Sequence, residues 1–111
     1  MIDQEIIDKI IKFRNDRNWS QYHTPKNLAI SLSLEANELL ELFQWVNSNQ
    51  AIENSKAEIK DELADIIIYS ILMADRIDLD IEEIVAKKLK KNNLKYPVNK
   101  SYGSNAKYTE L

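Results

Sequence analysis

Four acidic residues stand in two pairs with the same spacing, and they are the first candidates for chemistry in this sequence. Glu35 and Glu38 form the first pair, and Glu62 and Asp65 form the second. Residues three apart are neighbours on one helix face, so each pair would present its two carboxylates together. Carboxylate oxygens are hard metal ligands and can also accept a proton from water. Both roles depend on where the helices place these side chains.

The helix that should carry the first pair has an apolar stripe, and Glu35 lies inside it. At about 100° per residue with Glu35 at zero, the apolar side chains fall between about −20° and +80°. They are Leu28, Leu32, Leu39, Leu42, Phe43 and Val46. Glu38 lies at the edge of the stripe, and Glu41 points further round, where we expect it to be exposed or to support the ligands. Glu35 is therefore expected to be buried.

The second pair starts a segment that is apolar on every side. Residues 66–68 and 71–74 include no charged side chain, which predicts a buried helix with Asp65 at its start. Glu62, Asp65 and Tyr69 fall within about 60° of one another on that helix. These two acids and the phenol should therefore face the same way.

Several buried carboxylates need cations or shared protons, because unpaired buried charges repel and are costly to desolvate. The two helices carry no Lys or Arg between Lys26 and Lys56 or between Lys60 and Arg76. Oxygen ligands at helical spacing suit Mg²⁺ or Mn²⁺ with positions left open for water and phosphate. The sequence predicts a metal site, and carboxylates satisfied by other partners remain the alternative.

The elements that would position these residues are helices. Isoleucines at helical spacing predict a first helix from about residue 2, which fades between Asn15 and Asn18 and serves packing. An aromatic, polar loop follows and ends at Thr24, a plausible N-cap with Pro25 at the first helical position. The second helix should run from there to about Val46.

The second half of the chain predicts two more helices. Polar residues 47–54 indicate a loop, and a third helix should run from about Ser55 to Arg76. Asp80 and Glu83 have the spacing of a capping box for a fourth helix that ends just before Pro97. Residues 97–111 are expected to form an extended tail.

Composition supports a single all-α domain over residues 1–111. The chain is 44% hydrophobic and 30% charged, and it has one Gly and two Pro, too few turn residues for an all-β fold. A net charge of −3 gives no basic field for a nucleic-acid polymer. Without Cys, thiolate metal sites and disulfides are excluded. No apolar run approaches the roughly 20 residues of a membrane span, so a cytoplasmic protein is expected.

The two acidic pairs resemble the E-x-x-E…E-x-x-D signature of the MazG-like all-α nucleoside triphosphate pyrophosphohydrolases. Further matches are found in the segments 19–28, 38–45, 62–69, 95–97 and 107–111. These segments resemble the dCTP pyrophosphatase branch of that family. Asn37 departs from the family's usual Gly, and Lys95 departs from its usual Arg. The resemblance implies a four-helix MazG-like bundle in which Glu35, Glu38, Glu62 and Asp65 bind Mg²⁺.

The resemblance also implies substrate-binding residues. In the family, residues matching Trp19, His23 and Trp45 border the nucleobase pocket, and flat aromatic faces can stack a base. Trp45 lies beside Glu38 on the helix projection rather than within the apolar stripe, which favours pocket lining. Asn27 and Tyr69 belong to the matching segments and are expected to bind substrate as well.

The fourth helix offers positive and polar groups on its apolar face. Lys88 and Asn92 fall within about 60° of Ile81, and Tyr96 continues the row. Lys88 could neutralise a triphosphate and Asn92 could donate hydrogen bonds to it. The K-x-x-x-N-x-x-x-Y spacing resembles the family's phosphate-binding helix.

The expected reaction is magnesium-dependent hydrolysis of nucleoside triphosphates such as dCTP to the monophosphate and pyrophosphate. Glu38 is the preferred base, because water can reach the edge of the stripe. A homodimer or homotetramer is expected, with the pocket partly completed by a neighbouring subunit. A non-catalytic helical interaction module and a carboxylate-bridged di-metal oxidase are the alternatives. The oxidase lacks support because its Glu-x-x-His pairs are absent.

Overall fold

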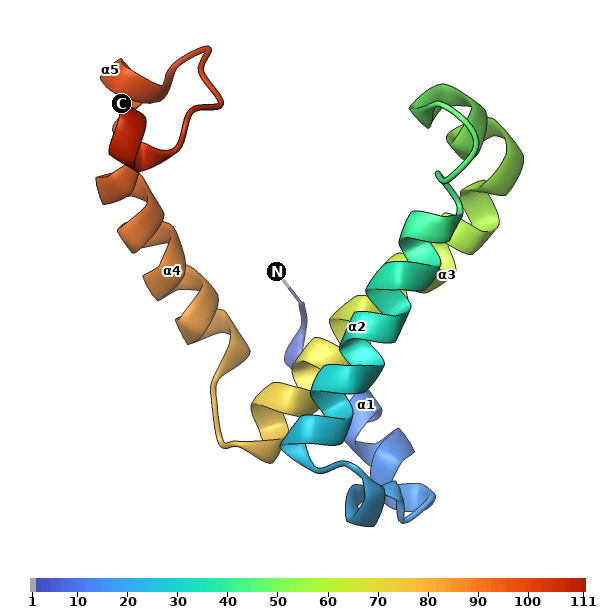
Figure 1. The fold of residues 1–111 in the computed structure, drawn as a ribbon. Helices are drawn as coiled ribbons and strands as arrows, with labels where there is room; N and C mark the ends of the chain where they lie inside the picture. Colours follow the sequence, from blue (N-terminus) through green and yellow to red (C-terminus); the bar gives the residue numbers. More distant parts are fainter. Residues whose placement is uncertain (1) are drawn as a thin grey trace. The chain divides into compact units, whose positions relative to one another are not determined.

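The structure is a computed structural model that describes residues 2–111, so Met1 of the predicted domain lies outside the described part. Its described residues form helices and turns and contain no strand, which confirms the all-α prediction. The chain divides into two compact units, the first ending at Asp78 and the second running from Leu79 to Leu111. Figure 1 shows the helices of both units.

The first unit opens with helix α1 (Gln4–Asp16), whose N-cap Asp3 accepts a hydrogen bond from the backbone of Glu5. The helix ends where predicted, and Asn18 then turns the chain with a positive φ of 53°. Asn tolerates this left-handed conformation better than most residues. The aromatic loop contains the 3₁₀ helix η1 (Trp19–Tyr22), which places Trp19 next to α1.

Helix α2 (Pro25–Glu41) begins as predicted and ends earlier than predicted. The Thr24 side chain accepts a hydrogen bond from the Asn27 backbone at 3.1 Å, which confirms the N-cap. The predicted end near Val46 is wrong. After Glu41 the backbone amides of residues 42–44 bond to carbonyls three residues back, so the chain tightens into turns. The apolar periodicity of the sequence continues through these turns, so it predicted a helix longer than the one observed.

Helix α3 (Ser48–Arg76) begins seven residues before its predicted start, so the predicted loop at residues 47–54 is wrong. Asn47 and Gln50 form a capping box with bonds of 2.9 and 3.0 Å that starts the helix despite its weak propensity. Burial of Ala51, which is 0% exposed, holds this first segment in place. Ser55 has non-helical angles (φ −135°, ψ 27°) and kinks the helix at the predicted start.

Helices α2 and α3 pack side by side along much of their length, and α1 contacts α3 (Figure 1). Among the described residues, the buried apolar side chains all lie on α2 and α3: Leu28, Ala51, Ile71, Leu72 and Ala74. Helix α3 is less enclosed than its sequence predicts, because Leu63 and Ile67 remain 50% and 41% exposed. The packed region of α2 and α3 carries both acidic pairs.

The second unit contains α4 (Ile81–Lys95), which Asp80 caps by accepting from the Glu83 backbone at 3.1 Å. Its end before Pro97 is as predicted. The segment expected to be an extended tail contains two short elements instead, α5 (Val98–Ser101) and η2 (Tyr108–Glu110). The Tyr108 ring packs edge-on against Tyr96 with centroids 6.1 Å apart, and this contact draws η2 back to the end of α4.

None of the described helices combines the length and the hydropathy that a membrane crossing needs.

Candidate active site

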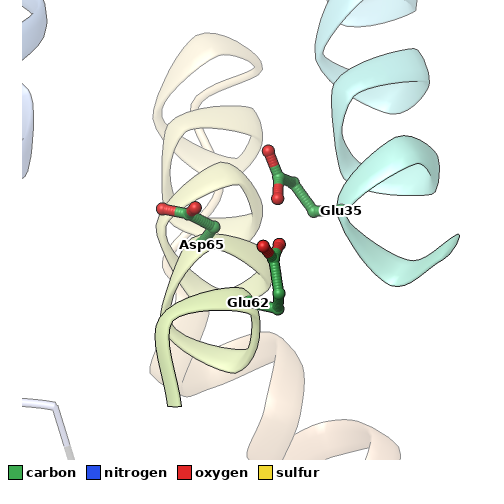
Figure 2. A group of neighbouring side chains, drawn as sticks. All are labelled: Glu35, Glu62 and Asp65. Atoms are coloured by element: carbon green, nitrogen blue, oxygen red, sulfur yellow. The ribbon is translucent and has the colours of Figure 1, made fainter. Parts of the chain in front are cut away.

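Three carboxylates converge between α2 and α3. Glu35 of α2 and Glu62 and Asp65 of α3 each offer an oxygen, and these oxygens lie within 4.8 Å of one another. Figure 2 shows the Glu35 side chain reaching from its helix toward the two acids of the neighbouring helix. All three are half-buried. The helical spacing within α3 and the packing of α2 against it therefore bring together three of the four predicted carboxylates.

The cluster is electrostatically strained when no cation is present. Hydrogen bonding to Glu62, burial and the nearby charges of Glu38 and Asp65 raise the pKa of Glu35 to about 8. The hydrogen bond from Glu35 lowers the pKa of Glu62, but burial and the same two charges outweigh it and leave that pKa raised. Glu35 therefore keeps its proton at neutral pH, where an isolated glutamate would be charged.

The cluster also has unused ligand atoms. Oε2 of Glu35 and Oε2 of Glu62 are buried and have no hydrogen-bond partner among the described residues. Buried polar atoms normally have a partner, so these two oxygens beside Asp65 are donor atoms that a cation would satisfy. An all-oxygen donor set fits Mg²⁺ or Mn²⁺. The residues present therefore fit the predicted metal site.

Glu38 stands apart from the other three acids. Its side chain is exposed and does not belong to the converging group, but it is close enough to raise the pKa of Glu35. It also lines a surface pocket with Leu34, Asn37 and Glu41 at the end of α2. Glu38 is thus exposed, as its predicted place at the edge of the apolar stripe of α2 suggests, and its role as a fourth metal ligand stays a prediction.

A cavity of about 460 Å³ lies beside the cluster, between α1, η1 and α3. Asp65 and Tyr69 belong to its lining, so the cavity and the carboxylates share a wall. Most of the remaining lining is apolar or aromatic: Ile6, Ile10, Phe13, Trp19, Ile68 and Leu72. The pKa of Tyr69 is raised by burial and by the charges of Glu35 and Asp65, so its phenol stays protonated and can donate a hydrogen bond.

Trp19 and His23 reach this cavity because η1 folds against α1. The rings of Phe13 and Trp19 meet edge-on with centroids 5.7 Å apart, and the Arg17 guanidinium lies 3.6 Å from the centre of the Phe13 ring. Arg76 at the end of α3 donates from Nε to the His23 carbonyl at 3.1 Å. The structure thus brings two of the predicted base-pocket residues together.

Two other predicted substrate-binding residues lie differently from expectation. Asn27 donates from its side chain to the Tyr22 carbonyl at 3.0 Å, so it fixes the aromatic loop and is not part of the cavity lining. Trp45 lies in the turn after α2, is 87% exposed and does not line the cavity that contains Trp19. The early end of α2 explains the position of Trp45.

The predicted phosphate-binding residues belong to the second unit. Lys88 and Asn92 line a groove of about 390 Å³ on α4 with Ile84, Val85 and Leu89. Tyr96 follows at the end of the helix and contacts Tyr108. Their shared face on α4 agrees with the helix projection, and their role toward the carboxylates stays a prediction.

The sequence did not indicate that α1 contributes to the site. Its residues Ile6, Lys9, Ile10, Phe13 and Arg14 all line the cavity, whereas the isoleucine spacing predicted packing alone. Arg14 is only 8% exposed, although it is charged and lies on a helix with an exposed face. An isoleucine that lines a pocket and one that fills a core have the same helical spacing, so no sequence pattern separates them.

Comparison with known proteins agrees with this geometry. Residues 30–111, which include both acidic pairs, match the MazG-like family. The chain belongs to the MazG-like family. This MazG-like chain is 37% identical over 105 residues to dCTP pyrophosphatase 1 of Mus musculus and 35% identical to that of Homo sapiens. Each match covers 90% of the chain, and the chain spans 62% of the length of these curated relatives.

A solved structure of a pyrophosphatase from Archaeoglobus fulgidus is also similar to the MazG-like chain, with 43% sequence identity and a TM-score of 0.80. The match covers 85% of this chain and 91% of that chain. This chain therefore shares its fold with a solved pyrophosphatase.

Proposed function

We propose that this chain is a metal-dependent pyrophosphohydrolase that converts deoxynucleoside triphosphates such as dCTP to the monophosphate and pyrophosphate. One observation carries the proposal: the carboxylate cluster and the apolar cavity share Asp65 as a common wall. A nucleotide needs these two neighbouring environments, one for a charged triphosphate and one for a flat base. The names of the two mammalian relatives and of the archaeal pyrophosphatase agree with this reaction.

Glu35, Glu62 and Asp65 would hold the metal, with Glu38 as a further ligand or as the base. Bound there, Mg²⁺ would neutralise the carboxylates and the phosphate oxygens and so lower the cost of charge on the phosphates. The proton that the raised pKa keeps on Glu35 must leave when the cation binds. Metal binding should therefore strengthen as the pH rises.

The chain's own residues would place the substrate and activate water. Glu38 at the exposed edge accepts a proton from a water molecule whose oxygen attacks the α-phosphorus. The bond between that phosphorus and the bridging oxygen breaks, and pyrophosphate leaves. Trp19 provides an aromatic face for the base, and the Tyr69 phenol donates a hydrogen bond from the wall that the cavity shares with the cluster.

The reaction is tested with purified protein, Mg²⁺ and a panel of dCTP, dTTP, dUTP, dGTP and dATP, with pyrophosphate and orthophosphate measured separately. The proposal expects stoichiometric pyrophosphate and monophosphate from at least one of these nucleotides. Release of orthophosphate without pyrophosphate would identify a different phosphatase reaction. No turnover of any nucleotide would contradict the proposed function.

The role of the cluster is tested with Glu35→Gln, which keeps the shape of the side chain and removes its charge. Turnover should be abolished while helicity is retained in circular dichroism. Glu53→Gln is the matched control, because Glu53 is an exposed carboxylate on α3 outside the cluster. Wild-type activity in Glu35→Gln would refute the ligand role.

We also propose that the active protein is a homo-oligomer in which a second copy supplies Trp45 to the base pocket. Large apolar side chains remain exposed in the first unit, notably Leu40 at 64% and Trp45 at 87%. An exposed Trp beside other exposed apolar groups is typical of an interface.

Subunit mixing tests this arrangement. Glu35→Gln and Trp45→Ala should each be inactive alone or nearly so. If Trp45 acts on the site of another copy, a mixed oligomer contains one site with both wild-type residues, and activity should return after joint refolding. Mixed oligomers that stay inactive would show that both residues serve the same copy's site or that Trp45 has another role.

Lys88 and Asn92 on α4 would bind phosphate oxygens of the substrate. The Lys88 ammonium would pair with a phosphate oxygen, and the Asn92 amide would donate a hydrogen bond. Lys88→Met should raise the KM for the triphosphate, whereas Lys90→Met, which changes an exposed lysine outside the groove, should not. Equal effects of the two variants would argue against a specific phosphate contact.

A further inference from the structure

Apart from the exposed Lys9, the cavity beside the carboxylates contains two polar groups that the proposed reaction does not yet use. Arg14 of α1 and His23 of the aromatic loop both line it, within a mainly apolar and aromatic wall. A few polar groups converging in an apolar cavity are the usual means by which a protein recognises one ligand among several of similar size. These two groups therefore bear on which nucleobase the cavity accepts.

Arg14 is held rigidly while part of its guanidinium stays available. Its Nη1 donates to Oδ2 of Asp75 at 2.6 Å, and its Nε donates to Oδ1 of Asn15 at 3.0 Å. A guanidinium has five N–H donors in a fixed fork, so these two bonds leave others unused. The side chain is 9% exposed, and its neighbouring space is the cavity itself.

His23 offers a complementary neutral group. Burial and the charge of Arg14 lower its pKa, so the imidazole is uncharged at neutral pH. Its Nδ1 is buried and has no hydrogen-bond partner among the described residues. The bond from Arg76 to the His23 carbonyl fixes the backbone at this position. A ligand in the cavity would satisfy both the imidazole nitrogen and the remaining donors of Arg14.

We propose that Arg14 determines base specificity by donating a hydrogen bond to a carbonyl oxygen of the nucleobase, with His23 contacting the adjacent ring edge. This inference rests on the proposed function, since it assigns the base to this cavity. Cytosine, thymine, uracil and guanine carry a carbonyl oxygen, and adenine does not. Adenine has an amino group where guanine and hypoxanthine have the 6-carbonyl, so a donor of Arg14 placed for that oxygen meets a second donor, and the cavity disfavours adenine.

A purely structural role for Arg14 is the competing explanation, because its bond to Asp75 ties α1 to α3. The two explanations differ in what Asp75→Asn should do. That variant breaks the ion pair and leaves the guanidinium in the cavity, so base preference should remain. Arg14→Met removes the donor and fills a similar volume, so base preference should disappear.

The test measures binding of dIMP and dAMP by titration calorimetry in the presence of Mg²⁺. These ligands differ at position 6 of the purine, where dIMP has a carbonyl and a neighbouring N–H and dAMP has an amino group. The wild type should bind dIMP about 10- to 100-fold more tightly, the range expected for a hydrogen bond from a charged donor. The ratio should fall to near one in Arg14→Met and stay high in Asp75→Asn.

Equal affinities in the wild type, an unchanged ratio in Arg14→Met or no binding of either ligand would overturn the inference. The double variant Arg14→Met/Asp75→Asn removes both partners of the ion pair and should show the same ratio near one in a folded protein. Binding needs no turnover, so failure here is separate from failure of the nucleotide panel. A protein that hydrolyses dCTP without this base preference would keep the proposed function and lose only the role of Arg14.

Discussion

Replacing Glu35 by Gln should stabilise the protein without metal and remove its stabilisation by Mg²⁺. The pKa of Glu35 is raised from 4.5 to about 8, so the folded state favours the protonated form. Its contribution to stability is fully present below pH 4.5 and is lost as the pH rises through about 8. Gln cannot ionise, so the variant should avoid this loss.

The magnitude follows from the spacing of the carboxylates. Oxygens of Glu35 and Asp65 lie within 4.8 Å of each other. Two like charges at that distance repel by about 1 kcal/mol in bulk water and about 3.5 kcal/mol at the effective dielectric of a protein surface. Because Glu35 is half-buried, a gain between these limits is expected at pH 9. For a domain of this size, about 1 kcal/mol raises Tm by about 4 to 8 °C.

The assay is thermal unfolding at pH 4 and pH 9, with and without Mg²⁺, at one protein concentration. Without metal, Glu35→Gln should exceed the wild type in Tm by at least about 4 °C at pH 9 and match it at pH 4. Mg²⁺ at about 100 times its Kd should stabilise the wild type by about 2.7 kcal/mol and the variant far less. Glu53→Gln should follow the wild type throughout.

A lower Tm for Glu35→Gln than for the wild type at pH 9 without metal would refute the reasoning about repulsion. Equal stabilisation of both proteins by Mg²⁺ would refute the assignment of Glu35 as a ligand. These two results are independent, because the first concerns the empty cluster and the second concerns the filled one.

Three further predictions concern the scaffold around the site. Leu28→Ala should lower the free energy of unfolding by about 2 to 5 kcal/mol in urea titration, because Leu28 is 1% exposed; a loss below about 1 kcal/mol would contradict its core role. Thr24→Ala removes the cap that accepts from the Asn27 backbone and should cost about 1 kcal/mol in the same assay, whereas Thr24→Ser should be nearly neutral. Arg76→Ala frees the His23 carbonyl and should raise the KM about three- to ten-fold in steady-state kinetics; a fall in kcat at constant KM would point away from a role in binding.

Local signals in the sequence were sufficient for much of the fold. The cap at Thr24, with Pro25 after it, located the start of α2, and Asp80 located the start of α4. Both signals act within one helical turn, so they need no information from the rest of the chain. The predicted boundary between α2 and α3 was wrong, because an apolar period continues past Glu41 and a capping box at Asn47 starts α3.

Some features of the candidate site could likewise be predicted from local spacing, and others could not. Helical spacing alone placed Glu62, Asp65 and Tyr69 on one face of α3 and Glu38 at the edge of the apolar stripe of α2. Spacing did not reveal that Asn27 fixes a loop, because that role depends on the position of the Tyr22 carbonyl five residues away. Nor did spacing reveal the cavity, since its lining comes from three elements.

The sequence by itself determined that the chain is helical, that its acids come in pairs and that Glu35 lies where a helix should be apolar. These properties follow from the periodicity of a single helix. The tertiary structure decided that α2 brings Glu35 within reach of Glu62 and Asp65, and that α1 adds Arg14 to a cavity beside them. Such contacts join residues far apart in the chain, and only the packing of helices against one another sets those distances.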